Sequence, residues 1–479
     1  MNTERKLLVG FARLCLRLLV GLALLGLPAL QPVSAGAPQE GGAPAAGTTT
    51  RVSVRSNGTQ GNDFSAEASI SATGRFVAFS SVATSLVSGD TNGVPDVFVH
   101  DRKTGQTTRV SVASDGTQGN DFSDAPSLSA TGRYVAFFSL ASNLVSGDTN
   151  GTGDVFVHDR ATGQTTLVTV ASDGAQANGA SHHASISATG RYVAFQSEAS
   201  NLVSDDTNNT FDVFVHDRET GQTTRVSVHS DGTQGNDLSL HPSLSATGRY
   251  VAFDSFASNL VSGDTNTCGP YTDGTCPDIF VHDRATGQTT RISVASDGTQ
   301  ANGYSDIPSI SASGRFVAFH SFATNLVSDD TNGVPDVFVH DRKTGQTTRV
   351  SVASDGTQGN DNSDGFSLSA TGRYVAFHSF ATNLVNGDTN STSDVFVHDR
   401  ASGQTTRVSV ASNGTQGNGG SYDPSLSATG RYLAFYSDAS NLVNGDTNSI
   451  GDIFVHDRQG VGSVEEPFPA ELGLRTGDN

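Results

Sequence analysis

The sequence PSLSATGRYVAFFSLASNLVSGDTNGTGDVFVHDRATGQTTLVTV at residues 126–170 decides the fold, because close variants of it recur along most of the chain. Its most constant part, VFVHDR or IFVHDR, occurs seven times, with the histidine at 100, 158, 216, 282, 340, 398 and 456. Successive copies are 58 residues apart, except for 66 residues between the third and the fourth. A fixed period of this length is typical of solenoids, propellers and arrays.

Each repeat contains four segments with the composition of short strands, at 126–130, 133–139, 154–160 and 165–170 in the repeat quoted above. They are rich in β-branched and aromatic residues and are bounded by Gly, Asp, Asn or Thr. Four strands in each of seven units predict an all-β fold, a seven-bladed β-propeller of four-stranded blades. The repeats begin with a fourth-strand sequence at 49–54 and end after a third strand at 452–458. We therefore expect the N-terminal strand to pair into the last blade and close the ring.

The pattern PSLSATGRYVAF, followed by DVFVHDRATGQTT and RVSV-like segments, resembles the TolB-type (PD40, WD40-like) propeller repeat of exported bacterial proteins. The resemblance extends over about residues 49–458. It implies an envelope or extracellular location and a binding or scaffolding role. Members of this family bind very different partners, so the resemblance names no ligand.

The N-terminus has the features of a secretory signal. Four basic residues precede the apolar run LLVGLALLGLPAL, and VSA at 33–35 offers small residues for cleavage. We expect a signal peptide at 1–35, a flexible linker at 36–47, the propeller at 48–458 and a flexible tail at 459–479. The mature chain is expected to be a secreted or periplasmic monomer without a membrane span.

Composition narrows the class of partner. The net charge of −20 argues against nucleic acid and anionic membranes as partners. The chain has 40 Asp against 8 Glu, 53 Gly and three Lys, which favours turns over helices.

Cys268 and Cys276 lie close together in one loop, and in an oxidising compartment we expect them to form a disulfide.

Two loops of each repeat hold about a dozen residues or more, and in a propeller both lie on one face. In the second repeat these are ASDGTQGNDFSDA and LASNLVSGDTNGTG, whereas the opposite face carries the short turns SATG and DRATGQ. Because loops carry function more often than the scaffold does, we expect the ligand site on the long-loop face.

Positions that differ between the repeats are the better candidates for a ligand site, because residues present in every blade serve the fold. We predict a site at the mouth of the central channel. Its candidate residues are Glu67, Asp124, His182, His183, His241, Asp306, His320, Asp364, His378, Asp423 and Tyr436. Among them His182, His183 and His241 come from adjacent blades and are the best candidates for binding a transition metal.

The string DTN and a following aspartate suggest a calcium site in each blade. An EF-hand interpretation fails, because Asp101 would lie about 17 Å away along a strand. A smaller site remains, and its alternative is a loop braced by Asx-type hydrogen bonds. The candidate ligands are Asp90, Asn92, Asp96, Asp148, Asn150, Asp154, Asp206, Asn208, Asp212, Asp330, Asn332, Asp336, Asp388, Asn390, Asp394, Asp446, Asn448 and Asp452.

The string HDR suggests a catalytic His–Asp pair, but seven copies on a third strand are poorly placed for catalysis. We therefore expect no catalytic residue here. His100 is predicted to pack and hydrogen-bond between blades, and Asp101 to pair with Arg75 of the adjacent short turn.

These observations favour a non-enzymatic binding or scaffold propeller, which engages an envelope or extracellular protein, a peptide or a glycan. The alternatives are a hydrolase or lyase with its site at the channel mouth, and a surface protein stiffened by cations. No GxSxG, HExxH, phosphate-loop or cofactor motif occurs.

Overall fold

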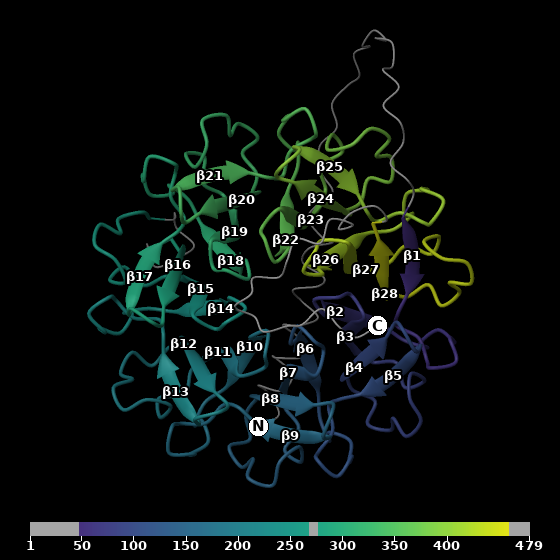
Figure 1. Cartoon of the computed structure of the whole chain (residues 1–479), viewed down its shortest axis with the longest axis horizontal. Coiled ribbons are helices and arrows are strands. Elements are labelled where there is room, and N and C mark those ends of the chain that lie inside the picture. Colours follow the sequence, from purple (N-terminus) through teal and green to yellow (C-terminus); the bar gives the residue numbers. More distant parts are fainter. Residues whose placement is uncertain (1–46, 268–275, 459–479) are drawn as a thin grey trace. The chain divides into compact units, whose positions relative to one another are not determined.

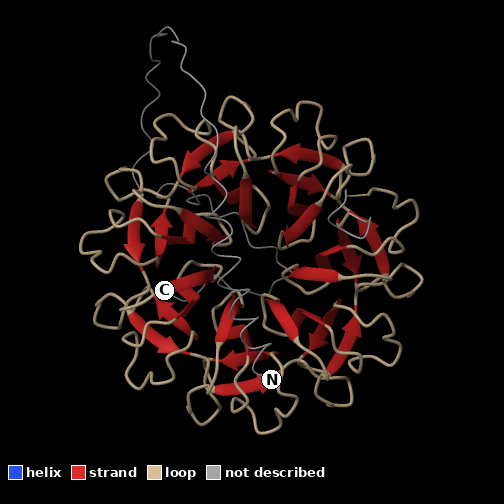
Figure 2. Cartoon of the chain, turned by 180° about the vertical axis from the view of Figure 1, so that it is seen from behind, coloured by secondary structure: helices blue, strands red, loops and turns tan. Residues whose placement is uncertain are grey.

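The computed structural model describes residues 47–267 and 276–458, which belong to the compact unit Ala45–Asn479. These residues form strands and loops only (Figure 2). None of the described segments is a helix long and apolar enough to cross a membrane. The predicted signal peptide, the predicted linker up to residue 46, Cys268 and the predicted tail lie outside the described residues. Cys276 is disulfide-bonded and buried.

The strands form seven antiparallel four-stranded sheets around a common centre (Figure 1). Blades 1 to 4 contain β2 (Ser65–Ile70), β3 (Phe76–Ser81), β4 (Asp96–Asp101) and β5 (Gln106–Arg109); β6 (Ser123–Leu128), β7 (Tyr134–Ser139), β8 (Asp154–Asp159) and β9 (Gln164–Leu167); β10 (Ser181–Ile186), β11 (Tyr192–Ser197), β12 (Asp212–Asp217) and β13 (Gln222–Arg225); β14 (Ser239–Leu244), β15 (Tyr250–Ser255), β16 (Asp278–Asp283) and β17 (Gln288–Arg291).

Blades 5 to 7 repeat the same order of strands. They contain β18 (Ser305–Ile310), β19 (Phe316–Ser321), β20 (Asp336–Asp341) and β21 (Gln346–Arg349); β22 (Ser363–Leu368), β23 (Tyr374–Ser379), β24 (Asp394–Asp399) and β25 (Gln404–Arg407); β26 (Ser421–Leu426), β27 (Tyr432–Ser437), β28 (Asp452–Asp457) and β1 (Thr48–Arg51). The outermost strand of blade 7 is the first strand of the chain, paired with β28 from Thr48↔Asp457 to Arg51↔Phe454. The predicted seven-bladed propeller and its closure by the N-terminal strand are confirmed.

Two predicted strand boundaries are wrong. The innermost strand of blade 2 begins at Ser123 rather than Pro126, because the chain continues to pair with β7 on both sides of an irregularity. The outermost strand ends at Leu167 rather than Val170, because Val170 forms only an isolated bridge with Gln176. The first of these differences places Asp124, one of the predicted ligand residues, inside the innermost strand.

The hydrophobic core lies between neighbouring blades, and the two faces of a blade differ in shape. On one face of blade 1, Phe79 and Phe98 stack with ring centroids 6.0 Å apart and pack against blade 7. The other face presents the smaller Ala78, Val97 and Val99 to Phe137 and Phe156 of blade 2. Large side chains on one blade thus fill the space that small side chains leave on the next.

A closed circle of backbone hydrogen bonds joins the innermost hairpin turns of the short-turn face. Ala72 N donates to Ala130 O at 3.0 Å, and the same bond repeats from each blade to the next. The last bond runs from Ala428 N to Ala72 O at 3.0 Å and completes the circle. Each turn therefore satisfies a backbone donor with an acceptor of the neighbouring blade.

Arginine and aromatic side chains also connect neighbouring blades on the short-turn face. Arg75 donates through Nε and Nη2 to the two carboxylate oxygens of Asp101, at 2.9 and 2.8 Å, so the predicted pair is confirmed. The Arg75 guanidinium stacks on Phe76, and Arg160 of the next blade covers the same ring at 4.3 Å. A Cβ at Gly132 would overlap the Phe76 ring, so this turn needs glycine for close packing as well as for its φ of 70°.

The histidine of VFVHDR connects the third and fourth strands to the preceding blade. His100 Nδ1 lies 2.9 Å from Thr107 Oγ1, and Thr107 Oγ1 donates to Val54 O at 2.5 Å. Burial lowers the pKa of His100 from 6.5 to about 4, Arg102 adds to this effect and Asp101 opposes it. The folded protein therefore binds a proton at this site less readily than the unfolded chain does.

We predict that these histidines make the protein acid-sensitive between pH 6.5 and 4. The unfolded chain takes up protons below 6.5, while folded His100, His282 and His398 stay neutral until about pH 4, so stability falls with pH. Each shift of this size corresponds to about 3 kcal/mol. The triple His→Asn variant should lose less stability between pH 7.5 and 4.5 than the wild type, as measured by chemical denaturation.

His229→Asn is the matched control, because His229 lies in an outer loop and pairs with Asp231. An identical loss of stability in the triple variant and the wild type would contradict the prediction.

Candidate functional site

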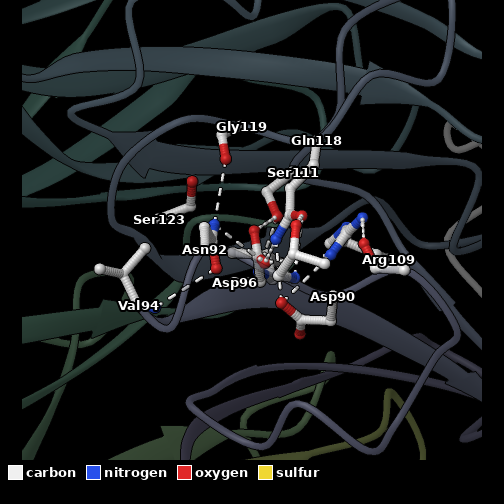
Figure 3. Close-up of polar contacts among 12 residues, drawn as sticks. Asp90, Asn92, Val94, Asp96, Arg109, Ser111, Gln118, Gly119 and Ser123 are labelled. Carbon is white, nitrogen blue, oxygen red and sulfur yellow. Dashed lines mark hydrogen bonds and ion pairs between the residues drawn. The ribbon is translucent and has the colours of Figure 1, made fainter.

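The DTN loop of blade 1 is filled by hydrogen-bond donors (Figure 3). Gln118 Nε2 donates to Asp90 Oδ1 at 2.9 Å and to Asp96 Oδ2 at 2.8 Å. Arg109 Nη1 lies 3.4 and 3.3 Å from the same two carboxylates. Ser111 Oγ donates to the other oxygen of Asp96 at 2.5 Å. An amide and a guanidinium thus occupy the positions between the carboxylates.

Asn92 completes the brace of this loop. Its Nδ2 donates to Gly119 O at 3.0 Å, and its Oδ1 accepts from Val94 N at 3.3 Å, which closes an Asx turn. Burial raises the pKa of Asp96, while the bond from Ser111 and the charge of Arg109 lower it. In the described residues no group of three or more His, Cys, Asp or Glu side chains lies close enough to hold a metal ion. Calcium in these loops stays a prediction.

Blade 2 differs from the other blades at the arginine position. Leu167 stands where the other six blades have arginine. Gln176 Nε2 still donates to Asp148 and to Asp154, at 2.9 Å each, and Thr169 donates to Asp154. Burial raises the pKa of Asp154 to about 6, and Asp148 adds to the rise. Within the described residues no guanidinium pairs with these two carboxylates. The pKa values of Asp212 and Asp278, whose loops keep their arginine, are also raised by burial, to about 6 and about 7.

We predict that Leu167→Arg stabilises the protein by about 1 kcal/mol at pH 8. A raised pKa means that ionised Asp154 is unfavourable in the folded state, so its cost is present above pH 6 and disappears below. The gain should therefore be larger at pH 8 than at pH 5, as measured by thermal unfolding. Thr166→Arg, which adds the same charge at an exposed neighbouring position, is the control.

The same variants test calcium. If a cation binds between Asp148 and Asp154, a chelator should lower the melting temperature of the wild type and have less effect on Leu167→Arg. Unchanged melting curves on chelation would contradict calcium binding.

The second candidate site is formed where the innermost strands begin, at the long-loop face. In each innermost strand the register with the next strand shifts at this point, as between His182 and Ser185 in β10. One residue of each shift adopts the left-handed conformation, with φ between 48° and 56°: Glu67, Ala125, His183, His241, Ile307, Gly365 and Asp423. Residues other than glycine rarely adopt this conformation, which costs about 1–3 kcal/mol at each position except Gly365.

The predicted ligand residues belong to three positions of the repeat, two adjacent ones on the innermost strand and one on the next strand. Glu67, His183, His241 and Asp423 occupy the left-handed position. The residues one position earlier are Asp124, His182, Asp306 and Asp364, and they pair across the strands with Phe138, Gln196, His320 and His378. The predicted residues His320 and His378 are therefore cross-strand neighbours of the predicted residues Asp306 and Asp364. We call these two positions with their cross-strand partners, Tyr436 included, the axial ring.

Histidines dominate blades 3 to 5 of the axial ring. The rings of His183 and His241 meet edge to face, 4.9 Å apart, and His182 packs on Phe138 at 4.5 Å. Burial lowers the pKa of His183 to about 3, and His241 and His182 add to the effect. We call His182, His183, His241 and His320 the imidazole arc.

Two histidines of the imidazole arc are paired with carboxylates instead of converging on one point. His241 Nδ1 lies 2.8 Å from Asp254 Oδ1, and His320 Nδ1 lies 2.7 Å from Asp306 Oδ1. Burial would lower the pKa of His241, but Asp254 and Asp306 raise it. In the described part of the chain, His182, His183 and His241 do not form a group that could hold a metal ion. The metal site predicted at these three residues stays a prediction.

Carboxylates dominate blades 6, 7, 1 and 2. We call Asp364, Asp423, Glu67 and Asp124 the carboxylate arc. Glu67 Oε2 accepts from Ala125 N of the next blade at 2.8 Å and from Ser80 Oγ at 3.2 Å. Glu67 and Asp423 keep exposed surface, yet the surrounding strands withdraw water from them, and this burial raises the pKa of both. Burial and the neighbouring Glu67 also raise the pKa of Asp124.

Sequence reasoning missed several residues of both sites. Gln118 and Ser111 brace the loop of blade 1, and their signal was available, since TQGN-like and SV-like strings recur in every repeat. Ile307 and Gly365 belong to the axial ring through their backbone conformation, for which their side chains give no signal. Asp254 is 1% exposed and binds His241, although its position varies like a surface residue.

No protein-family model and no curated protein matches the sequence. Solved structures with a similar arrangement include TolB from Acinetobacter baumannii, with 15% identity and a TM-score of 0.38 over 65% of this chain. The chain spans 59% of the length of that TolB. An oligogalacturonate lyase from Vibrio parahaemolyticus has 12% identity and a TM-score of 0.49, over 85% of this chain and 93% of its own.

An acylaminoacyl peptidase from Pyrococcus horikoshii has 10% identity and a TM-score of 0.49, over 83% of this chain and 52% of its own. None of these likenesses assigns a ligand or a reaction to this chain. The class of protein that its own strands define is the seven-bladed β-propeller.

Proposed function

We propose that this protein is an exported, non-enzymatic binding propeller that holds its ligand at the axial ring. One observation carries the proposal: polar and charged side chains that differ between blades gather where the innermost strands begin, whereas the VFVHDR-like and TGR strings repeat in every blade. A scaffold needs the repeated residues alone. A site specific to one ligand needs positions free to differ, and these lie at strained backbone on the long-loop face.

Exposed apolar side chains give further support. Among the described residues, the large hydrophobic side chains that stay exposed are Ile307, at 39%, and Phe322, at 52%. Both belong to blade 5 and lie at or next to the axial ring. Phe322 meets the rings of Tyr304 and His320 edge to face, 6.1 and 5.3 Å away. Aromatic groups beside charged groups favour peptides and glycans as ligands.

Membership of the TolB-type repeat family and an exported location are parts of the same proposal. The seven repeats and the signal-like sequence at 1–35 support them. The partner in this proposal is an envelope or extracellular protein, peptide or glycan. A hydrolase or lyase at the same place remains the alternative from the sequence, and activity toward polysaccharides would favour it.

A thermal-shift screen with short peptides, oligosaccharides and divalent cations tests the proposal. We predict that ligands which raise the melting temperature of the wild type act less on the variant with Ile307→Ser and Phe322→Ser. Both side chains are exposed, so the variant should fold. The matched control carries Ala161→Ser and Thr162→Ser, at exposed positions of the short-turn face. Equal shifts in both variants would contradict an axial site.

A further inference from the structure

The carboxylate arc is a run of negative charge that no arginine or lysine pairs with in the described part of the chain. Its charged neighbours are imidazoles: His320 and His378 lower the pKa of Asp364, and His378 also lowers that of Asp423. Its members come from four successive blades, and their charges act on one another: Asp364 raises the pKa of Asp423, Asp423 raises that of Glu67, and Glu67 raises that of Asp124. The arginines of the described residues pair elsewhere, as in Arg75–Asp101 on the short-turn face and Arg109–Asp96 in the DTN loop. Bringing four such groups together is unfavourable unless a positive partner joins them.

His378 supplies an independent sign of a ligand at one end of this arc. The side chain is 6% exposed, and its Nδ1 is buried with no hydrogen-bond partner among the described residues. A buried polar atom without a partner is rare, because its desolvation is not compensated. The neighbouring His320 sits at the same repeat position and does have a partner, Asp306.

The absence of a side chain at Gly365 lets the His378 ring pack against the backbone of the innermost strand. Gly365 has a φ of 48°, and a Cβ at this position would overlap Nδ1 and Cε1 of His378 and would lie 3.2 Å from Asp423 Oδ1. The imidazole and the carboxylate therefore converge above the Gly365 backbone. Blade 6 keeps the register of the other innermost strands and adds one pair, Phe366↔Phe377, next to Gly365.

We propose that the carboxylate arc and His378 bind a primary ammonium group, presented by a lysine side chain of a peptide. An ammonium group carries three donors and one positive charge. It can donate to the carboxylates of Asp364 and Asp423 and to Nδ1 of His378, and it neutralises the arc. This inference rests on the proposed axial ligand site and names the chemistry of its ligand.

Calorimetric titration with the peptide acetyl-Gly-Gly-Lys-Gly-Gly-amide tests the inference. The wild type should bind the peptide, and affinity should fall about tenfold or more in the Asp364→Asn, Asp423→Asn variant. The matched control is the Asp297→Asn, Asp355→Asn variant, which removes the same charge from exposed outer loops. Asparagine is native at the equivalent Asn57 and Asn413, whose side chains accept the same turn bond.

Three further measurements separate the outcomes. The same peptide with an acetylated lysine should not bind, and His378→Phe should weaken binding while keeping a ring of similar size. Spermidine is the second source of ammonium groups: tighter binding of spermidine than of the peptide would overturn the peptide assignment. Equal binding in the arc variant and the control would overturn the inference, because it would show attraction to net charge alone.

The outcome also distinguishes the inference from the proposed function. Suppose that a neutral oligosaccharide raises the melting temperature of the wild type but not that of the Ile307→Ser, Phe322→Ser variant. If the lysine peptide also fails to bind, the axial site stands and the ammonium ligand is wrong. If manganese or calcium alone raises the melting temperature of the wild type but not that of the Asp364→Asn, Asp423→Asn variant, the site binds a metal ion and the ammonium assignment is wrong.

Discussion

The closed circle of alanine hydrogen bonds on the short-turn face constrains the rest of the structure. Each innermost turn donates to the next and accepts from the previous one, and the circle closes from Ala428 to Ala72. With seven equivalent bonds, the angle between neighbouring blades is set at the axis. The Arg–aromatic–Arg stacks and the Arg–Asp pairs hold the outer parts of the same face in that geometry.

This fixed face allows the opposite face to differ from blade to blade. The innermost strands are joined through their turns at one end, so their other ends can carry irregular register and unfavourable φ angles without loss of the ring. The cost of the strained positions, about 1–3 kcal/mol each, is offset by the core between blades. Residues such as Glu67 and His183 can then be placed for ligand binding rather than for packing.

Much of the fold could be predicted from the sequence because the same pattern of four strands recurs in seven repeats. Period, strand number and ring closure all follow from where VFVHDR and TTRVSV recur. The Arg75–Asp101 pair could also be predicted, since the two residues flank short turns at the same end of two neighbouring strands. The candidate site could be predicted only in part. The variable positions can be read from a comparison of the repeats, but the register shift that places them on the innermost strand depends on backbone conformation.

The DTN loops show the limit of reasoning from spacing. Asp90, Asn92 and Asp96 have the side-chain oxygens of a cation site, and the same oxygens serve equally as acceptors for Gln118, Arg109 and Ser111. Those donors come from a strand and a loop about 20 residues further along the chain, so a local motif cannot reveal them. Charge balance in such loops depends on the tertiary neighbours.

The pairing of β1 with β28 has a consequence for biogenesis. The first strand of the propeller finds its partner about 400 residues later, so it has no permanent neighbour until synthesis of the last blade is complete. Loop closure over this distance is an entropic cost that only the finished ring repays. Loss of even the final strand would leave Thr48–Arg51 and β27 as open edges, able to pair with another chain. Ring closure therefore depends on a complete last blade.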